Sequence, residues 1–239
     1  MYHNDKKYAL TNCVLLDGSE HMEPQTGKAV CIGGEKINEI VDAQHIPAGY
    51  EAVDLGGKYV LPGLINMHVH LPASGKPKKK ASDPKKLVKL ITSCALTNRI
   101  GVNMCEGYAK TQLLSGVTTI RTLGDVGYEV VTLRDQIDAG QILGPRILAS
   151  GPLMAIPEGH GAPLIALTSG TPEEARTAVA QNLKAGVNAI KIAATGGVTD
   201  AQEIGEAGSP QMSVEQMRAI CDEAHQYGVI VGAHAQSPE

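Results

Sequence analysis

The chain has 239 residues, of which 43% are hydrophobic and 19% are charged, and its formal net charge at pH 7 is −4. This composition is typical of a globular protein with a sizeable core, and it excludes a disordered chain. The negative charge and the absence of Phe and Trp give no reason to expect nucleic acid or an anionic membrane as a partner.

The five cysteines are odd in number and form no Cys-x-x-Cys pair. This pattern argues against a disulfide framework and against a zinc knuckle. The N-terminus leads into no signal-peptide hydrophobic stretch, and no apolar run approaches the length of a membrane span. We therefore expect a cytoplasmic location.

Residues 1–60 are expected to form the N-terminal part of a small β-sandwich-like domain. Short β-prone runs alternate there with turn glycines, which mark hairpins. The strands are too few for a complete sandwich. The predicted strands are 8–16, 28–32, 36–41 and 52–55, with turns at Asp17-Gly18, Gly33-Gly34 and Gly56-Gly57.

Residues 61–239 alternate between strands and helices, which predicts parallel strands joined by crossover helices. Apolar runs indicate the strands, and capping residues indicate the helix ends. The predicted strands are 60–70, 117–123, 146–150, 189–194 and 229–234, and the predicted helices lie within 84–114 and at 129–139, 171–185 and 213–227.

A (β/α)8 TIM-like barrel is favoured over a doubly wound sheet, because polar residues stand at the C-terminal ends of the predicted strands. Such a barrel usually takes about 250 residues, and only 179 (239 − 60) follow residue 60. The predicted fold class is therefore α/β, with a barrel truncated after about five strands. We expect the chain to be an incomplete fragment.

His68 and His70 end the first predicted barrel strand. Side chains alternate along a strand, so both imidazoles point to one side while Val69 points to the other. Two imidazoles at this spacing can hold one metal ion. The alternative is that one or both are hydrogen-bonded strand residues without a metal.

Lys191 lies at the end of another predicted strand, where alternation sends Ile190 and Ile192 towards the helices and Lys191 into the barrel. A buried lysine is costly as a cation, and its pKa tends to fall. The neutral amine can react with carbon dioxide to form an anionic carbamate that bridges two metals. An ion-paired or snorkelling lysine is the alternative.

Three further residues complete the candidate site. His234 faces inward at the end of the last predicted strand, and His160 stands in a glycine-flanked loop that would cover the barrel mouth. A structural histidine and a plain turn residue are the respective alternatives. His160 is predicted to bind substrate, and so is Tyr108, one of seven tyrosines available for an aromatic contact.

These residues resemble the metal-dependent amidohydrolase superfamily, in its imidazolonepropionase-related branch. Within that branch the chain is similar to carbamylated-lysine enzymes that cleave Xaa-Pro dipeptides or release C-terminal amino acids from peptides and N-acyl amino acids. The match rests on the order and spacing of Leu16-Asp17-Gly18, Gly34-Glu35-Lys36-Ile37, Leu61 to Ile65 before His68 and His70, Ser115 to Thr119, Ile190-Lys191, Gly159-His160-Gly161, Gly196-Gly197 and Gly232-Ala233-His234.

The resemblance implies a site with two divalent metal ions, most often zinc. His68 and His70 would bind one ion, carboxylated Lys191 would bridge both, and His234 would bind the second. A bridging hydroxide would attack the carbonyl carbon of an amide bond. The family also uses a histidine after the sixth strand and an aspartate after the eighth, and neither lies in this chain.

Two positions depart from the family pattern. Asn66 stands where an aspartate is frequent, at a position that is not a metal ligand. The segment Arg121 to Asp125 differs from the usual Arg-Asp pair, so a substrate contact from the second strand is in doubt.

The leading hypothesis is a metal-dependent hydrolase of peptide-like or N-acyl amino acid bonds. A catalytically incompetent fragment or pseudoenzyme is the first alternative, and a cyclic-amide hydrolase of the same superfamily is the second. Lys191 counts against a deaminase, which usually works with one metal. The expected partners are a small-molecule or dipeptide-like substrate and, for the complete protein, further copies of itself.

Overall fold

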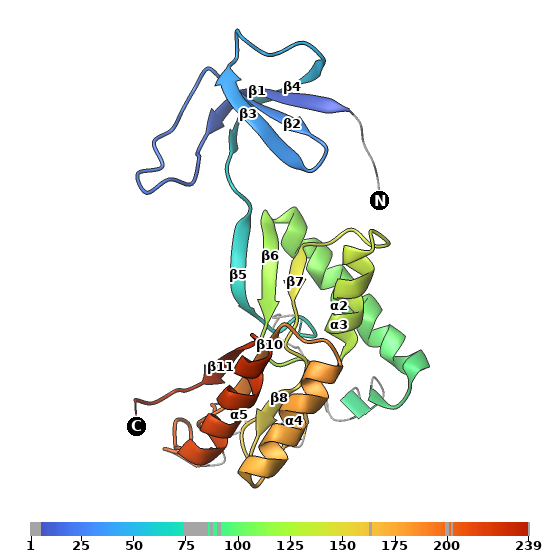
Figure 1. The fold of residues 1–239 in the computed structure, drawn as a ribbon, viewed down its shortest axis with the longest axis vertical. Coiled ribbons are helices and arrows are strands. Elements are labelled where there is room, and N and C mark those ends of the chain that lie inside the picture. Colours follow the sequence, from blue (N-terminus) through green and yellow to red (C-terminus); the bar gives the residue numbers. More distant parts are fainter. Residues whose placement is uncertain are drawn as a thin grey trace. The chain divides into compact units, whose positions relative to one another are not determined.

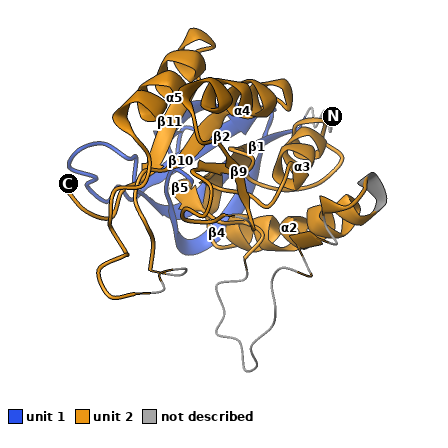
Figure 2. Ribbon diagram, turned by 90° about the horizontal axis from the view of Figure 1, so that it is seen from below, with its two compact units in different colours: residues 1–63 blue, residues 64–239 orange. Residues whose placement is uncertain are grey.

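The computed structural model describes residues 6–73, 86, 88–89, 92–162, 164–198, 201 and 203–238. The chain folds as two compact units, residues 1–63 and residues 64–239 (Figure 1, Figure 2). The unit boundary thus lies between Gly63 and Leu64.

The first unit is a four-stranded sheet with the order β3-β2-β1-β4. β2 and β3 form an antiparallel hairpin, and Gly34 in its turn has φ +61°, a conformation that glycine adopts at little cost. β4 runs parallel to β1 rather than forming a hairpin. The strands are β1 Lys7–Leu15, β2 Lys28–Gly33, β3 Lys36–Asp42 and β4 Tyr50–Val60.

The sequence predicted that Gly56 and Gly57 end the last strand of this unit, but the strand continues through them. Both have positive φ, +62° and +78°, and they lie inside β4 where its register with β1 shifts. Asp54 Oδ1 accepts the Gly56 N–H at 2.7 Å and the Asn12 side-chain amide at 2.7 Å. This local bonding accommodates the extra residues, so the strand continues beyond the glycines.

The second unit contains only parallel strand pairs among the residues described. They form the sheets β5-β6-β7 and β11-β10-β8-β9 (Figure 1). The strands are β5 Leu64–Val69, β6 Val117–Thr122, β7 Arg146–Leu148, β8 Leu153–Ala155, β9 Ala166–Thr168, β10 Ala189–Ala193 and β11 Ile230–His234.

The segment between β7 and β8 connects the two sheets. The Asn188 N–H donates to the Ala149 carbonyl at 2.7 Å, and the Asp125 N–H donates to the Gly151 carbonyl at 2.9 Å. β7, before this segment, pairs with β6, and β8, after it, pairs with β10. The chain passes through five consecutive strand positions of a barrel, and the short β8 and β9 were not predicted.

Helices form an arc outside these strands (Figure 2). Thr171 caps α4 by accepting the Glu174 N–H, and Ser213 and Gln216 form a reciprocal capping box at the start of α5. Part of the predicted helical stretch 84–114 lies outside the described residues, namely 84, 85, 87, 90 and 91. The helices are α2 Ala95–Leu114, α3 Glu129–Asp138, α4 Pro172–Lys184 and α5 Val214–Gln226.

The main core lies between the strands and this arc of helices. Ile120 of β6 and Ile190 and Ile192 of β10 are buried in it. Because side chains alternate along a strand, Arg121 and Lys191 face the other side of the sheet, inside the curve of the strands. No helix in the described part of the chain is long and apolar enough to cross a membrane.

Candidate active site

The two histidines at the end of β5 converge on one point. His68 Nε2 and His70 Nε2 are 3.2 Å apart, while Val69 between them is buried in the core. Two nitrogens that each lie about 2.0–2.1 Å from a tetrahedral zinc ion are about 3.3 Å apart. The spacing of the two imidazoles therefore fits shared coordination of one ion.

The second ring nitrogen of His70 has a fixed partner. His70 Nδ1 lies 3.3 Å from the Gly124 carbonyl oxygen. A carbonyl oxygen only accepts, so this contact places the ring proton on Nδ1 and leaves the Nε2 lone pair directed at His68. This tautomer suits a metal ligand.

Lys191 is buried on the inner face of β10, with only 4% of its surface exposed. Within the described ranges its amine makes no hydrogen bond and no ion pair. Burial lowers the pKa of the Lys191 amine, and the nearby Arg121 guanidinium lowers it further. The lack of a charged partner among the described residues does not support an ion-paired lysine.

His234 and His160 stack on each other, with ring centroids 4.4 Å apart and an interplanar angle of 30°. His234 Nε2 lies 3.3 Å from the Gly196 carbonyl, which leaves His234 Nδ1 as the acceptor nitrogen. A Cβ on Gly197 would overlap the His160 ring. Gly197 thus leaves room for the His160 ring in the stack.

Electrostatic coupling joins the groups from separate strands. The pKa of His68 is lowered by burial first, and then by the positive charges of Lys191, His70, Arg121 and His234. The pKa of His234 is also lowered, by burial and then by His160, with a smaller effect of Lys191. The structure therefore brings His68, His70, Lys191, His160 and His234 together at the strand ends.

Arg121 belongs to this group, although the sequence only marked its segment as unusual. Its Nε donates to the Met67 carbonyl at 2.9 Å. That carbonyl lies where the register between β5 and β6 shifts, just before His68. The alternation from buried Ile120 is the signal in the sequence that places Arg121 on the inner face.

Tyr108 does not join the group. It lies in α2, half-buried, and packs against the main hydrophobic core. No contact between described residues links its ring to the histidines, so the structure gives Tyr108 a packing role. Its predicted part in substrate binding stays a prediction.

The predicted metal ligands fit a metal in part. The histidine pair on β5 has a ligand-like spacing. Among residues 6–73, 92–162, 164–198 and 203–238, however, no group of three or more His, Cys, Asp or Glu side chains could hold a metal ion. Lys191, the other predicted ligand on these strands, could bind a metal ion only in its anionic, carboxylated form.

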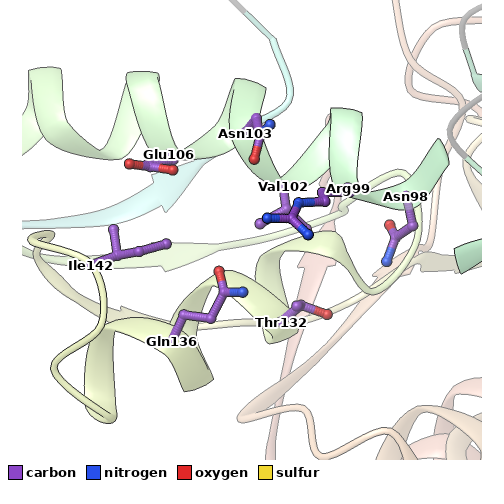
Figure 3. A pocket seen from close by; sticks show the side chains of 8 residues that line it. All are labelled: Asn98, Arg99, Val102, Asn103, Glu106, Thr132, Gln136 and Ile142. Carbon is purple, nitrogen blue, oxygen red and sulfur yellow. The ribbon is translucent and has the colours of Figure 1, made fainter. Parts of the chain in front are cut away.

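A separate pocket of about 340 Å³ lies between α2 and α3 (Figure 3). Its lining is mostly polar, and Gln136 Oε1 is buried there without a hydrogen-bond partner among the described residues. None of the predicted site residues lines it. The lining residues are Asn98, Arg99, Val102, Asn103, Glu106, Thr132, Gln136 and Ile142.

Solved structures similar to this chain include two peptidase-like proteins. One, named a "putative prolidase" from Bifidobacterium longum, is 58% identical with a TM-score of 0.75, and the match covers 98% of this chain and 51% of that chain. The other is a Xaa-Pro dipeptidase with bound methionine in the active site, 28% identical with a TM-score of 0.79, and 96% and 57% of the two chains are covered.

A curated relative is the ochratoxinase of Aspergillus niger, which is 29% identical over 147 residues, or 51% of this chain and 29% of that protein. The chain thus spans about half the length of the solved structures that it matches and less of this relative. The likeness over nearly the whole chain confirms the predicted fold, a truncated barrel with an N-terminal β domain.

Family models account for both units. Residues 7–60 match the NagA composite domain, and residues 59–239 match the amidohydrolase family. The second match covers well over half of the chain, and it agrees with the resemblance predicted from the sequence. The chain belongs to the amidohydrolase family.

Proposed function

We propose that this chain provides the N-terminal half of the active site of a metal-dependent hydrolase that cleaves amide bonds in dipeptide-like or N-acyl amino acid substrates. The observation that carries the proposal is Lys191, which is buried without a charged partner in the described structure and is coupled to His68 on β5. Burying an unpaired cation in that position is costly. Conversion of the lysine to an anion that binds metal ions removes this cost.

Conversion of Lys191 to a carbamate needs only the lysine amine and carbon dioxide. The neutral amine attacks carbon dioxide, an N–C bond forms, and one proton leaves the nitrogen for solvent. Burial favours the neutral amine, because it lowers the pKa of Lys191. The product carries one negative charge on two oxygens, enough to contact two ions.

Each protein group would then have a separate task. His68 and His70 would hold one ion, the Lys191 carbamate would contact both, and His234 would hold the second. Divalent ions bound there, zinc by preference, would polarise the substrate carbonyl and lower the pKa of a bound water to about 7. His160 would contact the substrate, and the Arg121 guanidinium would attract a carboxylate group of the substrate.

The proposal is tested with the purified chain loaded with zinc in the presence of bicarbonate. Hydrolysis is measured for Xaa-Pro dipeptides, N-acyl amino acids and a cyclic amide. Because the chain spans half of its solved relatives, each assay is run alone and with the second half of the Bifidobacterium longum protein added as a separate chain. We expect hydrolysis of the first two classes.

Two further measurements test Lys191 itself. After exposure to 13C-labelled bicarbonate, a carbamate carbon should be visible by NMR in the parent chain and absent in Lys191→Ala. The same variant should lose bound zinc and activity. Full zinc content and activity in Lys191→Ala would overturn the carbamate assignment, and turnover of the cyclic amide alone would overturn the substrate class.

A further inference from the structure

A buried polar layer lies behind the histidine pair, where β6 and β7 end. Thr122, Asp125 and Ser150 are each 0% exposed, and Glu129 is 1% exposed. Burying polar groups and carboxyl groups is costly unless they are hydrogen-bonded. The bonds that these residues make show what the layer holds in place.

Asp125 ties the ends of the two strands together. Its Oδ2 accepts the Thr122 hydroxyl at 2.8 Å and the Gly151 N–H at 3.1 Å, so one oxygen bonds to the end of β6 and to the segment after β7. The Asp125 N–H also donates to the Gly151 carbonyl at 2.9 Å. The carboxyl group thus closes a short link between neighbouring strands.

Gly124 is the residue that this link holds against the site. Its N–H donates to Ser150 Oγ at 2.8 Å, and its carbonyl faces His70 Nδ1 at 3.3 Å. Gly124 has φ +102°, and a Cβ there would lie 3.8 Å from the His70 ring and 3.4 Å from Leu153. Any other residue would be strained in this conformation, so the approach of the backbone to His70 depends on glycine and on the bonds around it.

We propose that Asp125 is a positioning residue for His70. By tying the ends of β6 and β7, it holds the Gly124 carbonyl where it accepts the Nδ1 proton of His70, and so directs His70 Nε2 at His68. Only one consequence of this inference rests on the proposed function, namely that His70 Nε2 is then ready to bind a metal ion. The contact itself is independent of the metal.

The molecule offers a matched control in Glu129. This carboxyl group is also buried and lies four residues further along the chain, but it accepts the N–H groups of Val126 and Gly127 at 3.1 and 2.8 Å. None of the hydrogen bonds of its carboxyl group reaches Gly124, Ser150 or Gly151 in the described structure. Removal of either carboxyl group leaves a similar buried defect, but only one defect lies in the link to His70.

The tautomer of His70 in the metal-free protein gives the first test. The variants Asp125→Ala, Asp125→Asn and Glu129→Ala are labelled with 15N-histidine, and imidazole nitrogens are recorded above the ordinary histidine pKa of about 6.5. We expect a proton on Nδ1 in the parent, in Glu129→Ala and in Asp125→Asn, whose amide oxygen can still accept both bonds. Asp125→Ala should mix the two tautomers.

Zinc affinity, measured by competition with a chromophoric chelator, gives the second test. Asp125→Ala should weaken zinc binding by about 10–100-fold, as for other groups that orient a ligand, and Asp125→Asn should stay within about threefold of the parent. An unchanged His70 tautomer in Asp125→Ala, or an equal change in Glu129→Ala, would overturn the positioning role. Absence of zinc binding in the parent would instead count against the proposed function. The positioning role of Asp125 would still be tested by the tautomer of His70.

Discussion

The strand-end site and the α2–α3 pocket differ in what they offer a ligand. The pocket has a volume of about 340 Å³ and polar side chains on opposite walls (Figure 3). The strand ends bring together four histidines and a buried lysine from β5, β10, β11 and the loop after β8, with lowered pKa values at His68, Lys191 and His234. Ionisable groups with altered pKa values that converge from several strands are the stronger sign of chemistry.

The difference follows from how the two regions are built. The pocket is lined by two helices and one loop residue, so its polar groups are those of ordinary helix surfaces. The strand ends of a parallel barrel, in contrast, collect side chains from distant parts of the sequence at one place. If this comparison is right, substitutions should cost much more activity at the strand ends than in the pocket.

The largest effect is expected for His68→Ala. Loss of one nitrogen from a pair 3.2 Å apart removes a proposed metal ligand. A metal that stabilises the reaction by several kcal/mol corresponds to about a 10³-fold loss in kcat/KM. Zinc content and kcat/KM are measured together in the zinc-loaded chain, with the second half of the Bifidobacterium longum protein added as a separate chain.

His225→Ala is the matched control, because His225 is exposed near the end of α5. It should keep both the zinc content and the activity of the parent. Equal losses in the two variants would mean that general destabilisation, rather than metal binding, explains the effect of His68→Ala.

A smaller loss, about 10–100-fold in kcat/KM, is expected for Gly197→Ala. The new Cβ would overlap the His160 ring, so this ring has to leave its stack on His234. Zinc content should stay close to that of the parent, because His234 keeps its bond to the Gly196 carbonyl.

Gly107→Ala provides the control for a glycine substitution. Gly107 lies inside α2, and no atom lies within 4 Å of a Cβ built there. Alanine favours helix, so a small gain in stability with unchanged activity is expected. Parent-like turnover by Gly197→Ala would show that the histidine stack does not contribute to catalysis.

The sequence predicted the regular elements well, because each has a local signal. The capping residues Thr171 and Ser213 placed α4 and α5 to within a residue or two, and the apolar runs placed β10 and β11 equally closely. β8 and β9 have three residues each, and runs that short carry no periodicity that could separate them from a loop.

The candidate site was predicted unevenly for a similar reason. Strand alternation was enough to place His68, His70 and Lys191 on the inner face, because the period of a strand is two. It could not show the stack of His160 on His234, which depends on the path of two loops and on the space left by Gly197. Tyr108 was assigned by residue type alone, without a positional signal.

A pH dependence is expected from Glu129. Burial raises the pKa of its carboxyl group in the folded chain, so the folded state binds a proton that the unfolded state has already released. The free energy of unfolding should therefore fall as pH rises from about 4.5 through the raised pKa, by at most about 1.4 kcal/mol per pH unit. Glu129→Gln should flatten this fall, as measured by urea unfolding at a series of pH values.

The result also bears on the comparison of the two regions. Asp125 has a raised pKa for the same reason, burial, and remains in the Glu129→Gln variant. Some pH dependence should therefore persist, and the two carboxyl groups together would place a titrating layer behind the strand ends. An identical pH profile in parent and variant would contradict a buried, titrating Glu129.

The smallest effect is expected in the α2–α3 pocket, from Gln136→Met. The side-chain oxygen of Gln136 is buried without a partner among the described residues, and replacing an unsatisfied polar group by an apolar one of similar size is neutral or stabilising, here by at most about 1 kcal/mol. Urea unfolding and kcat/KM are measured with Arg99→Ala alongside, because Arg99 lines the same pocket. Activity should stay within about twofold in both variants, since neither residue belongs to the strand-end group. A tenfold loss of activity with intact stability would make the pocket part of the functional machinery and end the contrast with the strand-end site.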